Sequence, residues 1–225
     1  MNFFLFQIFP YIALVTLFLG CTLRFDRDPY SWRSKSSQLL RKKQLVIGSV
    51  LFHVGVLIVL FGHAGGLLTP LWVFEAVGIS HHFKQMMAIV VGGVSGSVAF
   101  VGLLMLLHRR LFDPRIRNTS SPADIAILFL LLAQLSLGLL TIPVSLEHPG
   151  GEEMIKFMTW VQYIVTFRSD AYTFVEDVPL IFKLHLTLGM FILVVFPFTR
   201  LVHMLSAPVG YVFRKQYQIV RRREV

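Results

Sequence analysis

Four of the eight histidines lie inside long apolar stretches, where an ionisable side chain is costly to bury in a membrane. They fall in two pairs, His53 and His63 in one stretch and His185 and His203 in another. A single such histidine is ordinarily explained by a hydrogen bond to a neighbouring helix. Helix packing does not call for two histidines on each of two helices, whereas ligation of two haems by paired imidazoles does. The pattern therefore predicts two b-type haem sites with these four residues as axial iron ligands.

The other four histidines have simpler explanations. His81, His82 and His148 are expected in solvated loops, and His108 ends an apolar stretch beside two arginines. A histidine at a helix C-terminus is favoured by the helix dipole and needs no further role. A proton-relay role for His81 and His82 stays open.

Five apolar stretches are long enough to carry the paired histidines across a membrane. A helix of about 20 apolar residues crosses a hydrocarbon core of about 30 Å. The chain is 55% apolar and 15% charged, and soluble domains have about 25% charged residues. The expected spans are residues 3–23, 45–68, 85–107, 123–144 and 180–207. The predicted fold is an all-α integral membrane bundle of five helices over residues 1–206, followed by a basic tail over 207–225.

Two prolines and the N-terminal stretch bear on the limits of these spans. Pro143 is expected to end the fourth span, and Pro197 to kink the fifth, because proline removes a backbone hydrogen bond. The first stretch has the apolar character of a signal peptide, but it lacks a basic start and a small-residue cleavage site before Arg24. We expect it to be a retained first span.

The basic residues predict the direction of the spans. Of the 21 Lys and Arg residues, seven lie in 24–43, four in 109–117 and six from 200 onward. Five spans place these three segments on one side of the membrane. The positive-inside rule then predicts an outer N-terminus and a cytoplasmic C-terminus. The net charge of +9 is thus a signal of topology and of contact with lipid headgroups, and we expect no nucleic-acid partner.

This topology pairs the histidines across two helices. The second span runs outward and the fifth runs inward, so each contributes one inner and one outer ligand. The predicted pairs are His63 with His185 at an outer haem and His53 with His203 at an inner haem. In ideal helices the two ligands of the second span are about 15 Å apart and those of the fifth about 27 Å. We expect helix tilt and the Pro197 kink to absorb this difference.

Glycines and the single cysteine constrain the cofactors. A flat macrocycle against a helix needs positions without side chains, and glycines surround the ligands: Gly55, Gly62, Gly65, Gly66 and Gly189. Close packing between helices is the more common use of such glycines. One cysteine, Cys21, cannot provide the four thiolates of an iron–sulfur cluster, so any such cluster must belong to a partner.

Several long motifs resemble those of one known family. They are YSWRSKSSQLL (30–40), LFHVGVLIVLFGHAGGLLTP (51–70), KQMMAIVVGGVSG (84–96), RRLFDPRIR (109–117), LLTIPVS (139–145) and FKLHLTLGM with FPFTRLVH (182–203). In these motifs, and over nearly its whole length, the chain resembles the gamma subunit of bacterial respiratory nitrate reductase, a cytochrome b membrane anchor. The family's haem ligands fall on the same four histidines.

The resemblance implies a reaction and partners. Menaquinol or ubiquinol is oxidised near the outer haem, and its protons leave on the outer side. Electrons pass by the inner haem to a cytoplasmic iron–sulfur beta subunit and then to a molybdenum-containing alpha subunit that reduces nitrate. The chain is then the quinol-oxidising subunit of an oxidoreductase in the bacterial cytoplasmic membrane. From its charge alone, the basic tail is equally consistent with docking of a partner protein and with binding to lipid headgroups.

The resemblance also indicates a quinol site. A lysine at the outer start of the third span is associated with quinol in the family and matches Lys84, and Gly65 is expected near the quinol and the outer haem. The alternative for Lys84 is an interfacial lysine that extends its ammonium to water. Its place at a helix N-terminus on the outer side runs against both the helix dipole and the positive-inside rule, which favours a functional role.

Three other functions remain open at this stage. A related dihaem cytochrome b of a sulfite- or heterodisulfide-reductase-type complex would share the histidines but not the motifs outside the haem helices. A haem-free transporter or proton channel would use the histidines as a relay and would show no haem absorption. A purely structural anchor would leave four intramembrane histidines unexplained.

Overall fold

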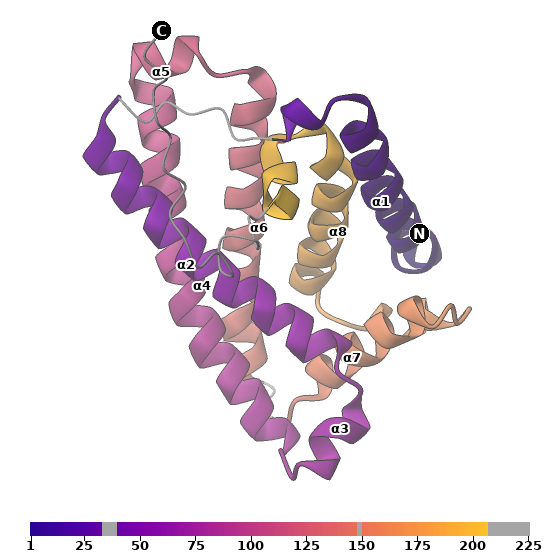
Figure 1. Cartoon of the computed structure of the whole chain (residues 1–225). Helices are drawn as coiled ribbons and strands as arrows, with labels where there is room; N and C mark the ends of the chain where they lie inside the picture. Colours follow the sequence, from indigo (N-terminus) through magenta and orange to yellow (C-terminus); the bar gives the residue numbers. More distant parts are fainter. Residues whose placement is uncertain (33–39, 148–149, 207–225) are drawn as a thin grey trace, which may run out of the picture.

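The structure, a computed structural model, describes residues 1–32, 40–147 and 150–206 (Figure 1). Within this part of the chain, five helices are long and apolar enough to cross a membrane: Phe4–Arg27, Lys42–Leu68, His81–Phe112, Pro122–Glu147 and Leu180–Phe198. The predicted all-helical fold with five candidate spans is confirmed. His148 and the tail over 207–225 lie outside the described residues.

The long helices are α1, α2, α4, α6 and α8, and shorter helices join them. Their bounds are Phe9–Arg27 for α1, Lys42–Leu68 for α2, His81–Phe112 for α4, Pro122–Glu147 for α6 and Leu180–Val195 for α8. The shorter helices are η1 (Phe4–Ile8), η2 (Pro29–Ser31), α3 (Leu71–Ala76), α5 (Pro114–Asn118), α7 (Glu152–Val165), η3 (Ala171–Val175), η4 (Phe196–Phe198) and η5 (Arg200–Ser206).

The long helices pack in the order α2, α4, α6, α8 and α1, and the contact between α2 and α4 is the most extensive. Figure 1 shows α2 and α4 running side by side over most of their length. Gly55 of α2 is buried in this contact. A Cβ added there would lie 2.6 Å from the backbone nitrogen of Ala99 and would also meet Ser95 O. Gly55 therefore serves close helix packing.

The short helices lie at opposite ends of the bundle, with α3 and α7 at one end and α5 at the other (Figure 1). At the α5 end, ion pairs link the three basic segments. Arg41 Nε lies 3.0 Å from Asp113 Oδ2, and Asp124 is 3.8 Å from Arg110 and 3.6 Å from Arg200. The described parts of the three basic segments thus meet at one end, as the charge pattern predicts. We call this the basic end and the other the α3–α7 end.

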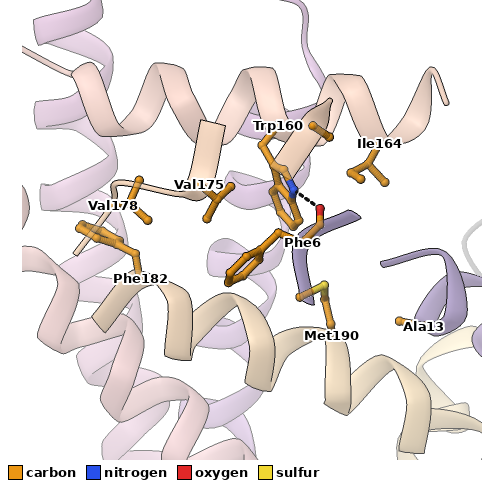
Figure 2. Close-up of a cluster of buried hydrophobic side chains, with 9 residues drawn as sticks. Phe6, Ala13, Trp160, Ile164, Val175, Val178, Phe182 and Met190 are labelled. Atoms are coloured by element: carbon orange, nitrogen blue, oxygen red, sulfur yellow. Dashed lines mark hydrogen bonds between the residues drawn. The ribbon is translucent and has the colours of Figure 1, made fainter. Parts of the chain in front are cut away.

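A buried apolar cluster joins α1, α7, η3 and α8 towards the α3–α7 end (Figure 2). It includes Phe6, Trp160, Val175, Phe182 and Met190. The Trp160 indole Nε1 donates a hydrogen bond of 2.8 Å to Phe6 O, as Figure 2 shows. A buried indole N–H needs a partner, and this one ties α7 to the start of the first span.

Two local expectations were wrong, and for one helix there was no expectation. Helix α6 continues through Pro143 to Glu147. Transmembrane helices tolerate proline because neighbouring groups and local adjustments satisfy the freed backbone atoms. His81 and His82 begin α4 instead of lying in a loop, since Ser80 caps that helix by accepting a bond from Phe83 N. Helix α7 was not expected at all, because it is too short to register as a span.

The fifth span is broken near its end. Helix α8 ends at Val195, Pro197 lies in η4, and Thr199 is extended with φ −116° and ψ 179°. Helix η5 then carries His203. The chain therefore leaves the helix axis after Val195, and His203 does not sit a full 18 helical residues beyond His185. This confirms that Pro197 interrupts the span.

Candidate functional site

The structure brings the four intramembrane histidines together in the two predicted pairs. The ring centroids of His63 and His185 are 6.2 Å apart with their planes at 46°. Those of His53 and His203 are 6.3 Å apart at 74°. Two imidazoles on opposite sides of one metal have centroids about 6.2 Å apart, because each metal–nitrogen bond is about 2.0 Å and each centroid lies about 1.1 Å behind its nitrogen. Both pairs therefore have the separation of a bis-imidazole metal site.

The paired rings meet across helices that are not close packing partners. Helix α2 packs along α4, whereas α8 packs on α6 and α1. The side chains of His53 and His63 are both exposed, although each faces a histidine from the fifth span. The two pairs thus join helices that do not pack closely on each other.

Three of the four imidazoles are anchored through Nδ1 to backbone carbonyls of their own helices. The acceptors are Ser49 O at 2.7 Å for His53, Val59 O at 2.8 Å for His63 and Arg200 O at 2.5 Å for His203. A neutral imidazole that donates from Nδ1 keeps the lone pair of Nε2 for a metal. This hydrogen bonding is the arrangement expected of metal-binding histidines.

His185 is held differently, by contacts with α6. Gln134 Nε2 lies 3.2 Å from His185 O and 3.5 Å from the ring Nε2. A Cβ added at Gly138 would lie 3.0 Å from the ring Cε1. The ring Nδ1 is buried and accepts or donates no hydrogen bond among the described residues. Packing against α6 thus sets the orientation of this ring.

Glycines leave open space beside the outer ligand of α2. An added Cβ at Gly62, Gly65 or Gly66 would meet no atom of the described residues within 4 Å. Gly189 instead faces Gln134, whose Nε2 would lie 3.1 Å from an added Cβ. The ring separations of both pairs, the Nδ1 bonds of three rings and the space beside the outer pair are compatible with bis-histidine haems.

Lys84 lies in the first turn of α4, at the α3–α7 end. Its side chain is 4% exposed. The ammonium Nζ is 2.9 Å from the Met158 sulfur of α7 and 4.0 Å from the Phe74 ring centroid of α3. The lysine therefore does not extend into water, as an interfacial lysine would. It is enclosed at the end of the bundle that also holds the His63–His185 pair.

The sequence did not lead us to Asp124, although its carboxylate forms ion pairs with two arginines. Its carboxylate contacts Arg110 and Arg200 at the basic end. The signal was present: Ser121 and Asp124 form a reciprocal cap, in which each backbone N–H donates to the other's side chain at 3.2 Å. An acidic cap beside a basic segment predicts such an ion pair.

Comparison with known proteins identifies the family of this chain. The family model described as "Nitrate reductase gamma subunit" matches residues 2–223. The chain belongs to this family. Among relatives of this gamma-family chain, the respiratory nitrate reductase 1 gamma chain of Escherichia coli (strain K12) is 48% identical over 223 residues, 99% of this chain and 98% of the relative. The nitrate reductase gamma chain of Bacillus subtilis (strain 168) is 43% identical over 219 residues, 97% of each chain.

A third relative bears on the alternative function. The Hdr-like menaquinol oxidoreductase cytochrome b-like subunit of Archaeoglobus fulgidus is 31% identical over 206 residues, 80% of this chain and 60% of the relative. The family match and the higher identities favour the nitrate reductase family over a heterodisulfide-reductase-type complex. With its five apolar helices, the chain is a membrane subunit of the nitrate reductase family.

Proposed function

We propose that this gamma-family chain oxidises a membrane quinol, menaquinol or ubiquinol, at its α3–α7 end and delivers the electrons at its basic end. The observation that carries the proposal is the pair of ring separations, 6.2 Å and 6.3 Å, at two levels of one bundle. When bound, two haems b supply one-electron carriers at those two levels, which connects the two membrane surfaces.

The four histidines would hold these groups through their irons. His63 and His185 would bind the outer haem, and His53 and His203 would bind the inner haem. Hydrogen bonds from Nδ1 to backbone carbonyls fix three rings in place and make Nε2 more basic. The α6 helix fixes the fourth ring through Gly138 and Gln134.

Lys84 is proposed to bind the quinol, with Gly65 nearby. Its Nζ donates to the Met158 sulfur, and a thioether is only a weak hydrogen-bond acceptor. Exchange of that contact for a quinol oxygen therefore gains a stronger hydrogen bond at little loss. The lysine thereby orients the quinol beside the outer haem, where its protons leave on the outer side.

The basic end is proposed to face the cytoplasm, with the N-terminus outside. An iron–sulfur beta subunit would accept the electrons there and pass them to a molybdenum-containing alpha subunit for nitrate reduction. The basic tail over 207–225 is proposed to dock this partner. The names of two relatives support only nitrate reductase and menaquinol as the classes of complex and substrate: the Escherichia coli protein is called a respiratory nitrate reductase chain and the Archaeoglobus protein a menaquinol oxidoreductase subunit.

Rapid mixing of the complete complex with quinol, followed by haem absorption, tests this function. In His63→Ala, we expect quinol to reduce the remaining haem more slowly than in the unaltered complex, because electrons must cross the vacated level. Dithionite should still reduce that haem fully. Reduction of it by quinol at the unaltered rate would overturn the proposed route, as would an unaltered complex in which quinol reduces no haem.

A further inference from the structure

The break in the fifth span leaves backbone carbonyls in need of partners. In a regular helix the carbonyl of Pro197 would accept from the N–H of Leu201. Here Leu201 N donates to Thr199 Oγ1 instead, at 3.3 Å. A buried carbonyl that loses its helical partner costs free energy unless another donor replaces the lost bond. The broken segment therefore depends on donors from another part of the chain.

Arg24, near the end of α1, supplies those donors. Its Nη1 donates to Pro197 O at 2.6 Å and to Thr199 O at 2.8 Å. Its Nε and Nη2 donate to Ser31 Oγ at 3.0 Å and Ser31 O at 3.1 Å. Hydrogen bonds from a charged donor are about twice as strong as neutral ones. One guanidinium thus joins the first span, η2 and both carbonyls of the break.

Gly20 brings α1 close enough for this contact. It precedes Arg24 by four residues, so both lie on the same face of the helix. A Cβ added at Gly20 would lie 2.8 Å from both Cβ and Cγ of the Pro197 ring. The backbone of α1 therefore rests directly on Pro197, and Arg24 holds the next turn of the broken segment.

The broken segment determines where one haem ligand lies. His203 belongs to η5, which starts immediately after Thr199. Its ring Nδ1 donates to Arg200 O, so its anchor lies inside the same short segment. The other three ligands are on the regular helices α2 and α8. Of the four ligands, His203 is the one whose position depends on the contact between α1 and the break.

We propose that Arg24 is a positioning residue for the inner haem. It acts through the backbone: by binding the carbonyls of Pro197 and Thr199, it sets the place at which His203 meets His53. This inference rests on the proposed function, because it takes His53 and His203 as ligands of one haem. It adds a residue of the first span to a site that is otherwise made by the second and fifth.

The test uses the complete complex with Arg24→Met, which removes every donor of the guanidinium and keeps an unbranched side chain. Arg27→Met is the matched control, since Arg27 is an exposed arginine at the same end of α1. The readouts are haem content, the low-spin spectrum and the midpoint potential of each haem. We expect inner-haem affinity to fall roughly tenfold or more, the effect of removing a group that orients a metal ligand, with the outer haem unchanged. Arg24→Lys should recover only part of this loss. The ammonium still donates hydrogen bonds, but it lacks the planar fork of the guanidinium.

The outer haem is an internal control for general damage. Equal loss of both haems in Arg24→Met would overturn the proposal, because it indicates a role in the fold as a whole. Two unchanged haems would also overturn it. If Arg24→Met does not assemble, Arg24→Lys and Gly20→Ala are measured in its place, and the same outcomes decide. An unaltered complex without two bis-histidine haems would instead contradict the proposed function.

Discussion

The inner and outer histidine pairs have the same ring separation but are built in different ways. The outer pair joins two regular helices, and α6 contacts the ring of His185. The inner pair joins a regular helix to η5, a short segment after a helix break. The break is held by Arg24 of the first span. Nearly equal ring separations are thus reached by packing against α6 at one level and, at the other, by a broken segment that Gly20, Arg24 and Asp124 contact.

This difference predicts different sensitivities. Substitutions at Gly138 in α6 should affect the outer haem, because a larger side chain would contact the ring of His185. Changes at the basic end should affect the inner haem, because its ligand segment packs there, with Leu201 and Val202 in a buried apolar cluster that includes Cys21. The following experiments break or sharpen this comparison, in order of decreasing expected effect.

Removal of one ligand from each pair should have the largest effect. His185→Ala is expected to lose the outer haem and keep the inner one, whereas His203→Ala should do the reverse. Haem content and a redox titration of the complex measure both outcomes. Loss of the same haem in both variants would show that the histidines do not pair between α2 and the fifth span.

Lys84→Met should reduce turnover with quinol while both haems stay bound. A hydrogen bond from a charged group contributes about 1.5–3 kcal/mol, so kcat/KM should fall roughly 10- to 150-fold. Lys183→Met is the matched control, since Lys183 lies at the same end and bonds Glu176 O. Steady-state assays with a soluble quinol analogue measure the effect. Unchanged turnover in Lys84→Met would leave this buried lysine with a packing role only.

Gly138→Ala should disturb the outer haem alone. The added methyl group would lie 3.0 Å from His185 Cε1, so the ring must shift by a few tenths of an ångström. We expect a shifted potential or low-spin signal for the outer haem and an unchanged inner haem. Gly92→Ala is the control, because no described atom lies within 4 Å of the added carbon. An inner-haem shift in Gly138→Ala would contradict the assignment of α6 to the outer pair.

Asp124→Asn should have the smallest effect, confined to the basic end. Its ion pairs with Arg110 and Arg200 are long, at 3.8 Å and 3.6 Å, which limits their contribution although the three side chains are mostly buried. We expect a slight fall in thermal stability and a small change in the inner haem, whose ligand bonds Arg200 O. Asp113→Asn, which breaks the Arg41 ion pair away from η5, should leave both haems as they are. A larger change at the outer haem than at the inner one would contradict the comparison.

Much of the fold was predictable because membrane insertion depends on local composition. Apolar length placed the spans, and the distribution of Lys and Arg brought the basic segments to one end. The same two properties selected the four histidines and their pairing. These features need no knowledge of which helix packs against which.

The two prolines show what the sequence could not predict. Pro143 remains inside α6, whereas Pro197 ends α8 within two residues. Both interrupt an apolar stretch in the same way. At Pro197, a contact with Arg24, 173 residues away along the chain, satisfies the carbonyl. A local pattern carries no information on such a partner.

Burial of Lys84 was equally beyond local reasoning. The residue is enclosed by α3 and by α7, and neither helix is long enough to be recognised as a span. Gly55 had the sequence context of a haem-contacting glycine, but it packs against α4. Only the structure identified the residues that pack around or enclose the site, whereas the proposed haem ligands were predictable from the sequence.

The haem-to-protein ratio of the purified complex, with the low-spin spectrum, tests the central claim most directly. Four histidines in two facing pairs are proposed to hold two haems b in this one chain. The prediction is two haems per chain, both low-spin with two imidazole ligands, and with distinguishable signals because the ring planes cross at 46° and 74°. A ratio of one or zero, or a high-spin haem at either level, would contradict it.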